Sequence, residues 1–369
     1  MEKLWKYKKI GEVCIVERGA SPRPIDKYIT DNESGINWIK IGDTSDSMYI
    51  TETAQKIIVE GMKKSRYVKP GDFLLSNSMS FGRPYILKID GCIHDGWLVL
   101  RDENALFDKR FLYYYLSSKT TYKKLKSMAV GGVVNNLNSE MVRNVIVPVP
   151  DKEEQSEIAD LFDKIKKILD DRKQELEQLD TLVKFRFVEM FGDIITGKYN
   201  YKIRKLGDVA FIGSSHRVFT TEFVESGIPF YRGTEIGELA NGIEPSEPYY
   251  ISEEHYNKLT KDNTKPRIGD LLMPSICNKG QIWMVDTDRP FYYKDGRVLC
   301  ISPNRDIFNS KYLEYFMRIK TLVEYPKLGS GSTFAEFKIF LLKDMDVLVP
   351  PRNVQNQFAD FVASVDKSK

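Results

Sequence analysis

The sequence predicts an α+β protein with two tandem mixed α/β domains, joined by a long coiled-coil helix and followed by a short C-terminal helix. Three observations lead to this fold class: an ordered internal repeat, a long helical segment without helix breakers, and a length of 369 residues that exceeds one average domain. We expect the two domains at residues 1–150 and 193–350. The central helix is expected at 151–192 and the terminal helix at 351–369.

The internal repeat has a period of about 200 residues and consists of matching phrases that occur twice in the same order. Each copy therefore indicates one mixed domain followed by its own helix, and two similar domains on one chain point to a ligand with two similar sites. The matched pairs are KIGEV (9–13) with KLGDV (205–209), PGDFLL (70–75) with RIGDLL (267–272), Asp95-Gly96 with Asp295-Gly296, VPVP (147–150) with VLVP (347–350), and Gln155 with Gln355.

The central helix is predicted because no glycine or proline occurs from Lys152 to Phe191 and the composition favours a helix. Spacings of four and three place apolar residues on one stripe, as in a coiled-coil strand. Roughly forty helical residues would extend about 60 Å, which suits a spacer better than the alternative, an amphipathic helix on one domain. The expected partner seam is Ile158, Phe162, Ile165, Leu169, Leu176, Leu179, Val183 and Met190.

The terminal helix is long enough to pack against only a short part of this seam. Phe358, Val362 and Val365 match the first seam positions, and the chain ends at Lys369. We therefore expect a partner protein or a second copy of the chain to cover the remaining seam.

Composition argues against several classes of protein. No stretch approaches the roughly 18 apolar residues that span a bilayer and no signal peptide is evident, so we expect a cytoplasmic protein without membrane contact. Cys14, Cys92, Cys277 and Cys300 are widely spaced and indicate neither a zinc site nor a disulfide framework. We expect no metal and no cofactor.

Catalysis is also disfavoured, because motifs that carry chemistry are missing. The three histidines are scattered and have no nucleophile motif beside them. GDIITGK at 192–198 has the spacing of a phosphate-binding loop, but Tyr199 stands where serine or threonine is required. Neither a methyltransferase motif nor the clustered carboxylates of a nuclease are found, so we expect a non-catalytic protein.

Charge is distributed unevenly although the whole chain carries only +3. Residues 1–150 contain 23 basic and 17 acidic residues, residues 151–192 contain 8 and 12, and residues 193–369 contain 24 and 23. The basic surplus of the first domain is compatible with phosphate binding, whereas the acidic central helix is not.

The ordered motifs resemble the specificity subunits of type I restriction-modification systems over essentially the whole chain. The resemblance is carried by the Gly-Asp-Phe/Leu-Leu phrases at 71–75 and 269–272, by V-P-V-P-x-x-x-E-Q-x-x-I-A-x-x-F at 147–162, and by RFVEMFG at 186–192. It departs from the family soon after Val365, where members commonly carry a second long helix.

This resemblance implies two target-recognition domains, each of which reads one half of a split target in double-stranded DNA. The helices would set the spacing of the halves and dock methyltransferase (M) subunits, expected to be two, that modify adenine. Restriction (R) subunits, which combine a motor and a nuclease, would cleave unmodified DNA. A bipartite target needs two readers at fixed phase on the duplex, which a stiff helix provides better than a flexible linker.

The candidate DNA contacts are polar residues in loops, because base edges and phosphates are bound by such side chains and by backbone amides. One pair of loops follows the strand after each Gly-Asp phrase, and a second, glycine-rich pair precedes the last strand of each copy. Ordinary solvated loops are the alternative. The expected contacts are Lys40, Asn77, Ser78, Ser80, Arg83, Asn135, Asn136 and Asn138 in the first domain and Arg232, Ser275, Asn278, Lys279, Gln281, Arg297, Ser330 and Ser332 in the second.

A second function remains open from the sequence. The weak net charge would also suit a duplicated protein-interaction scaffold whose long helix binds another helix and whose domains bind no DNA. Salt dependence separates the two functions, because phosphate contacts lose affinity steeply as salt rises.

Overall fold

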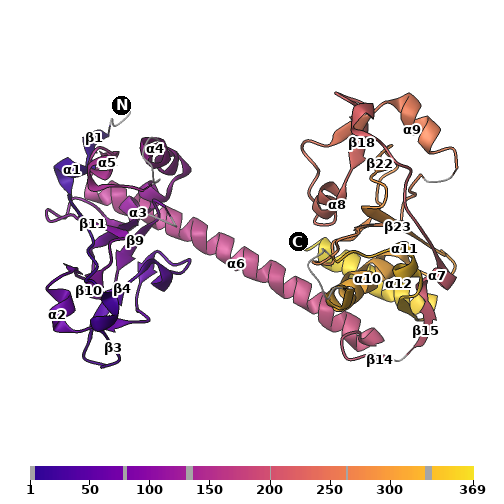
Figure 1. Ribbon diagram of the computed structural model, residues 1–369, viewed down its shortest axis with the longest axis horizontal. Coiled ribbons are helices and arrows are strands. Elements are labelled where there is room, and N and C mark those ends of the chain that lie inside the picture. The colour runs from indigo at the N-terminus through magenta and orange to yellow at the C-terminus, as the bar shows by residue number, and fades with distance from the viewer. Residues whose placement is uncertain (1–4, 78–80, 130–135, 200, 263–264, 329–334) are drawn as a thin grey trace. The chain divides into compact units, whose positions relative to one another are not determined.

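The computed structural model describes residues 5–77, 81–129, 136–199, 201–262, 265–328 and 335–369. Contacts divide the chain into two compact units, Met1–Arg172 and Lys173–Lys369, and this division falls inside one continuous helix. Strands and helices are mixed within each unit (Figure 1), so the predicted α+β class is confirmed.

The first unit contains two five-stranded sheets and a two-stranded ribbon among its described residues. One sheet has the order β2 (Ile15–Arg18), β11 (Trp97–Arg101), β8 (Phe73–Ser76), β9 (Pro84–Leu87) and β5 (Tyr49–Ile50). The other has the order β3 (Ile29–Thr30), β6 (Lys56–Ile57), β4 (Ile36–Ile39), β10 (Gly91–Ile93) and β7 (Arg66–Val68). The ribbon pairs β1 (Lys6–Lys9) with β12 (Ile146–Val149).

The central strands β8 and β11 are buried on both faces, which explains why they are nearly continuous apolar runs. Phe73 and Leu75 face one apolar cluster, whereas Leu74 and Val99 face another. The first cluster packs against helices of the unit, and the second lies between the two sheets. These buried strands hold the loops at their ends in place.

Short helices cover the first unit, and side chains cap two of them. Asp108 accepts hydrogen bonds from the backbone N–H groups of Arg110 and Phe111, and Asn138 accepts one from Met141. The helical segments are α1 (Ile10–Val13), α2 (Val59–Met62), α3 (Lys109–Ser117), α4 (Lys119–Ala129), α5 (Ser139–Arg143), η1 (Ile25–Lys27) and η2 (Ile41–Asp43).

The second unit repeats this arrangement with two four-stranded sheets among its described residues. The first sheet has the order β16 (Ala210–Gly213), β23 (Val298–Pro303), β20 (Leu271–Pro274) and β21 (Trp283–Met284). The second has the order β17 (Phe223–Val224), β19 (Tyr249–Ile251), β18 (Ile228–Tyr231) and β22 (Tyr292–Tyr293). Two ribbons pair β15 (Lys202–Lys205) with β24 (Asp346–Val349) and β13 (Gly192–Asp193) with β14 (Lys198–Tyr199).

The strand pairings confirm that the sequence repeat is a structural repeat. The strand β23 lies between β16 and β20 as β11 lies between β2 and β8, and both β4 with β10 and β18 with β22 are parallel pairs. The segment that resembles a phosphate-binding loop forms the β13–β14 hairpin instead. Helical segments of this unit are α7 (Leu206–Val209), α8 (Gly233–Leu239), α9 (Glu253–Leu259), α10 (Ser310–Glu324), α11 (Ile339–Lys343), α12 (Arg352–Asp366), η3 (Thr220–Glu222) and η4 (Tyr325–Leu328).

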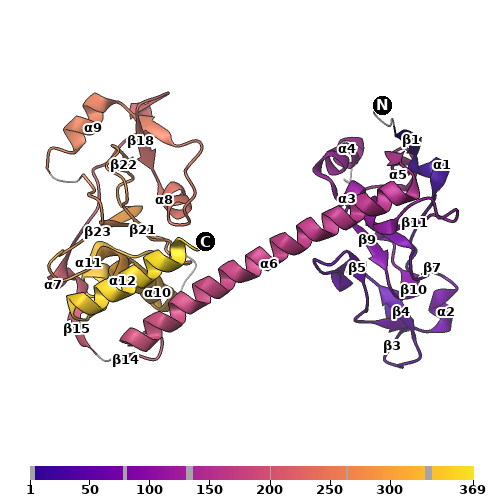
Figure 2. The ribbon, with the colours of Figure 1, turned by 180° about the vertical axis from the view of Figure 1, so that it is seen from behind.

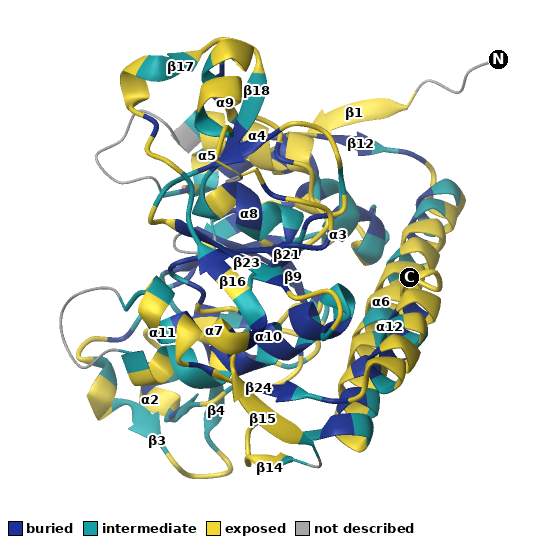
Figure 3. Ribbon diagram, turned by 90° about the vertical axis from the view of Figure 1, so that its right-hand side faces the viewer, coloured by how far each residue is buried: buried dark blue, intermediate teal, exposed yellow. Residues whose placement is uncertain are grey.

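The long helix α6 (Lys152–Phe191) is unbroken over 40 residues, as the absence of glycine and proline predicts. Its first turns belong to the first unit, where Ala159 is buried and the ring of Phe162 stacks on Tyr114 at 5.0 Å between centroids. Its middle turns are mostly exposed (Figure 3), and Leu169 keeps 64% of its surface.

The last turns of α6 form part of the core of the second unit and pair with α12. Phe358 contacts the rings of Phe187 and Phe191 at 5.3 and 5.5 Å between centroids. Nearer the chain end, Lys369 Nζ lies 2.7 Å from Asp180 Oδ1. The two helices therefore run antiparallel, side by side (Figure 2).

This pairing differs from the predicted seam at its end. Buried positions follow Val183 at spacings of four, at Phe187 and Phe191, whereas the seam position Met190 is only half-buried. The reason is geometric: here α6 packs on a globular core as an ordinary helix of 3.6 residues per turn, and a repeat of 3.5 drifts off the buried face.

A buried glutamine fixes the start of the helix that closes each repeat. Gln155 Nε2 donates to the carbonyl oxygens of Leu106 and Pro150, at 3.0 and 2.9 Å, and its Oε1 accepts from Asp108 N at 2.8 Å. Gln355 makes the matching bonds to Ile307 O, Pro350 O and Asn309 N. Both side chains are fully buried.

All four cysteines are buried, as expected for small apolar side chains. Burial raises the pKa of the Cys14 thiol to about 12 and that of Cys277 to about 11. Within the described ranges no cluster of residues could hold a metal ion. A search of the same residues finds no helix with the length and apolar character needed to cross a bilayer.

Replacing either buried glutamine is expected to destabilise its own unit. Gln155→Ala and Gln355→Ala each leave buried backbone groups without partners, which should cost about 2–4 kcal/mol in the free energy of unfolding. Gln178→Ala, at an exposed position of α6, is the control and should change it by less than about 0.5 kcal/mol. Urea unfolding of the full chain measures both, and equal effects for Gln355→Ala and the control would contradict this role.

Candidate nucleic-acid interface

Three loops of the first unit are tied together by hydrogen bonds at Asn77. Asn77 N donates to Gly96 O at 3.0 Å and Asn77 Nδ2 to Asp95 O at 2.8 Å, while Leu137 N donates to Asn77 O at 3.1 Å. We call the described residues 77, 81–83, 94–96 and 136–138 loop cluster 1. The loops after β8 and before α5, which the sequence singles out separately, thus form one surface with the loop before β11.

The second unit ties the corresponding loops together at Ser275. Ser275 N donates to Arg297 O at 2.8 Å, and Phe337 N donates to Ser275 O at 2.8 Å. We call residues 275–282, 294–297 and 335–338 loop cluster 2. Each repeat therefore presents one composite loop surface, built by the same backbone bonds.

The cations that follow β4 and β18 adjoin these clusters. Lys294 N donates to Tyr231 O, which places Arg232 beside the second cluster. Lys40 Nζ donates to Gln55 Oε1 at 2.7 Å, and Arg232 Nε binds the buried carboxylate of Glu235 at 3.1 Å. Arg232 is thus held by an ion pair, while Lys40 bonds a neutral amide.

The candidate contacts differ in exposure. Asn77 and Ser275 are buried, so they hold loops rather than face a ligand. Lys40, Asn136, Arg232 and Gln281 are half-buried, and Arg83, Asn138, Asn278, Lys279 and Arg297 are exposed. Ser78, Ser80, Asn135, Ser330 and Ser332 lie outside the described residues. Which of these residues touch DNA stays a prediction.

Several candidates already have partners within the chain. Arg83 binds Asp46 at 3.2 Å and lies over the ring of Tyr85, at 5.6 Å from its centroid. Asn138 Oδ1 caps α5, and Gln281 Oε1 accepts from Lys279 N at 3.0 Å. Arg83 would have to exchange its carboxylate partner to contact a phosphate, whereas Asn278 and Lys279 are presented by their loop.

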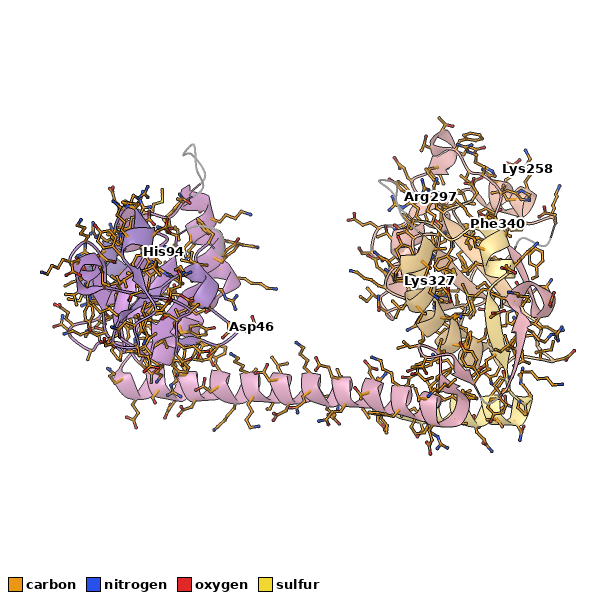
Figure 4. The ribbon with its side chains drawn as sticks, turned by 60° about the horizontal axis from the view of Figure 1, so that its bottom comes forward. Asp46, His94, Lys258, Arg297, Lys327 and Phe340 are labelled. Carbon is orange, nitrogen blue, oxygen red and sulfur yellow. The ribbon has the colours of Figure 1, made fainter. Side chains whose placement is uncertain are left out.

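Electrostatics stabilise the loop before β11. A hydrogen bond from Ser21 is the main cause that lowers the pKa of Asp95, and Arg23 adds an ion pair at 3.2 Å. Burial lowers the pKa of His94, which lies in the first unit (Figure 4), so its imidazole is neutral near pH 7. A Cβ on Gly96 would lie 2.1 Å from His94 Cε1, so a side chain here would displace the imidazole, whose Nδ1 accepts a hydrogen bond from Gly96 N.

The helix α4 carries a basic face. The exposed lysines on it are Lys119, Lys123, Lys124 and Lys126. Their charge suits contacts to phosphate that do not depend on base sequence.

Sequence reasoning missed two residues of these clusters, Glu336 and Lys338, and one residue, Ser21, that bonds to loop cluster 1. Ser21 bonds Asp95, and Glu336 pairs with Arg297 and with Lys338. Glu336 and Lys338 could have been found, because they occupy the positions of the candidates Asn136 and Asn138 in the repeat. The long-range bond of Ser21 has no local sequence signal.

Comparisons with known families and curated proteins agree on one family. A family model described as a type I restriction modification DNA specificity domain matches residues 2–179. The MjaIX and MjaVIII specificity subunits of Methanocaldococcus jannaschii are 23% and 22% identical to this chain, each over 98% of it and 86% of the relative. The EcoKI specificity subunit of Escherichia coli is 24% identical over 44% of this chain and 34% of its own length.

Solved structures share the fold. A chain from a study of complex assembly and conformational transition of the type I R-M system has a TM-score of 0.60 at 18% identity, covering 99% of this chain and 90% of that chain. The type I restriction-modification S subunit of M. genitalium has a TM-score of 0.55 at 14% identity, covering 100% and 90%.

Replacing Asn77 is expected to loosen loop cluster 1. Asn77→Ala removes the bond to Asp95 O and should cost about 1 kcal/mol in the free energy of unfolding, with faster amide exchange at Gly96 and Leu137. Ser275→Ala is the matched control, because the bonds given above for Ser275 are made by its backbone. Hydrogen exchange of both variants checks this prediction. Unchanged protection of the Gly96 and Leu137 amides in Asn77→Ala would show that the backbone hydrogen bonds alone hold the loops together.

Proposed function

The chain belongs to the specificity subunits of type I restriction-modification systems, and from this membership we propose that it reads a bipartite DNA target, one half with each unit. The single observation that carries the proposal is the repetition of one loop cluster in both units, built by the same backbone bonds. The family recognises DNA sequence, and nothing in the comparisons favours a scaffold without DNA binding.

In this function the loop clusters contact DNA and α6 connects the two readers. Polar and basic side chains exposed in each cluster supply donors for base edges and phosphates, among them Lys279 and Arg297. The basic face of α4 adds sequence-independent affinity. A continuous helix holds the orientation of one unit relative to the other on the DNA better than a flexible linker would.

The chain acts as the non-catalytic subunit of a larger assembly. Two M subunits would methylate adenine in the target, and R subunits would cleave unmodified DNA. We propose that the M subunits dock on the apolar stripe of α6, because Ile165 and Leu169 expose 43% and 64% of their surfaces. This assembly places the chain in the cytoplasm, where its DNA target is.

Deleting the gene is expected to abolish one methylated motif of the host genome. The motif should be split into two specific halves with methylated adenine, because each unit reads one half. Sequencing that detects N6-methyladenine in the parent and the deletion strain measures this, and plasmid-borne wild-type chain is the control that restores the motif. A contiguous motif, or a methylation pattern unaffected by the deletion, would contradict the proposal.

Charging the exposed stripe of α6 is expected to weaken assembly. A chain carrying Ile165→Glu and Leu169→Glu should co-purify with at least about tenfold less M subunit, because carboxylates replace apolar contacts. Its unfolding transition should stay unchanged, since both side chains are exposed. Lys164→Glu with Lys167→Glu, away from the stripe, is the matched control, and equal co-purification of the two double variants would exclude docking here.

A further inference from the structure

The second repeat carries one extra residue where its loops meet. Three residues connect β10, which ends at Ile93, to β11, which begins at Trp97. Four residues connect β22, which ends at Tyr293, to β23, which begins at Val298. Both loops contain Asp-Gly, so the added position is Arg297.

This arginine is exposed and anchored. Its side chain, labelled in Figure 4, keeps 57% of its surface. Its Nη1 forms an ion pair with Glu336 from the neighbouring loop of the cluster. Glu336 itself is largely covered, at 16%, and its other carboxylate oxygen accepts from Lys338 Nζ at 2.6 Å. The bond from Lys338 and the charge of Arg297 lower the pKa of Glu336, so the carboxylate stays ionised.

We propose that Arg297 reads a guanine in the half of the target bound by the second unit and that Glu336 is its positioning residue. This inference rests on the function proposed above. Guanine presents two acceptors, N7 and O6, in the major groove, and the guanidinium carries donors in a fork that matches them. Anchoring Nη1 to Glu336 leaves the rest of that fork to face the ligand.

Charge favours a base edge over a phosphate as the ligand. A phosphate is attracted by unpaired positive charge, and the carboxylate of Glu336 beside the guanidinium offsets this attraction. A base edge is bound by hydrogen-bond geometry, and a carboxylate that fixes the guanidinium reduces the rotamer freedom lost on binding. The ion pair therefore suits sequence reading rather than general affinity.

The first repeat has different chemistry at the same place. Asn136 and Asn138 stand where the second repeat has Glu336 and Lys338, and Gly96 is followed at once by the buried Trp97. Loop cluster 1 thus lacks an equivalent arginine among its described residues in this loop. A guanine contact from this loop is therefore expected in the second unit only.

The first test compares methylated motifs in cells that carry the M subunits and one variant of the full chain. Arg297→Ala should relax one guanine position in one half, with a loss of preference of about tenfold to a hundredfold, and leave the other half unchanged. Arg289→Ala, an exposed arginine in the loop before β22, is the matched control and should leave the motif intact. Glu336→Gln should relax the same position less, and Glu336→Asp should restore it.

The second test measures binding of the purified complex to a duplex that carries the motif. Replacing the guanine with 7-deazaguanine removes N7, so it should weaken binding of the wild-type complex about tenfold and leave the Arg297→Ala complex unaffected. Because this test uses the wild-type chain, it can still contradict the guanine contact if Arg297→Ala fails to fold. Full affinity for the 7-deazaguanine duplex at every guanine of that half would overturn the inference.

The outcomes separate this inference from the function on which it rests. An intact split motif in Arg297→Ala, or a uniform loss of affinity with a shallower salt dependence, would mark a phosphate contact and overturn the guanine reading. The split motif of the wild-type chain would still stand in that case. Absence of any motif dependent on the wild-type chain would instead remove the proposed function itself.

Discussion

Each unit depends on the buried amide of one glutamine. A primary amide without hydrogen bonds would be costly in an apolar interior, so Gln155 and Gln355 are stable there only because three backbone groups meet each of them. In each unit two of those groups lie in the loop before a core helix, α3 or α10, and the third belongs to the proline, Pro150 or Pro350, that follows the last strand and precedes the closing helix. The amide therefore fixes the direction in which α6 leaves the first unit and in which α12 lies on the second.

Residue patterns close together in the sequence were enough to predict the repeat, the helices and the candidate loops. The hydrogen bonds between residues far apart in the sequence could not be predicted from such patterns. The unbroken α6 follows from composition alone. The repetition of Gln155 at Gln355 is visible in the sequence, but its partners lie 47 and 49 residues away. Likewise nothing local shows that Leu137 bonds Asn77. The predicted seam drifts at Met190 because a heptad pattern cannot tell a partner helix from a globular core.

The two repeats share the same strand framework but differ in the side chains that surround corresponding positions. Beside Asp72 in the first unit, Arg101 lies within 3.4 Å of its carboxylate and also pairs with Glu17, and the backbone of β7 packs there. Asp270 in the second unit pairs instead with Arg305, at 3.1 Å, and both residues line a cavity of about 790 Å³. Both copies thus keep an aspartate paired with an arginine at this position, while the position of the arginine and the loops around it differ.

Buried cysteines have a practical consequence for work on this protein. Thiol reagents attack the thiolate, and burial both blocks access to the four native sulfurs and keeps them protonated at neutral pH. A single cysteine introduced at an exposed loop position can therefore be conjugated to a fluorophore without first removing the native ones. Pairs of such labels, one in each unit, would report the distance between the two units in solution by energy transfer.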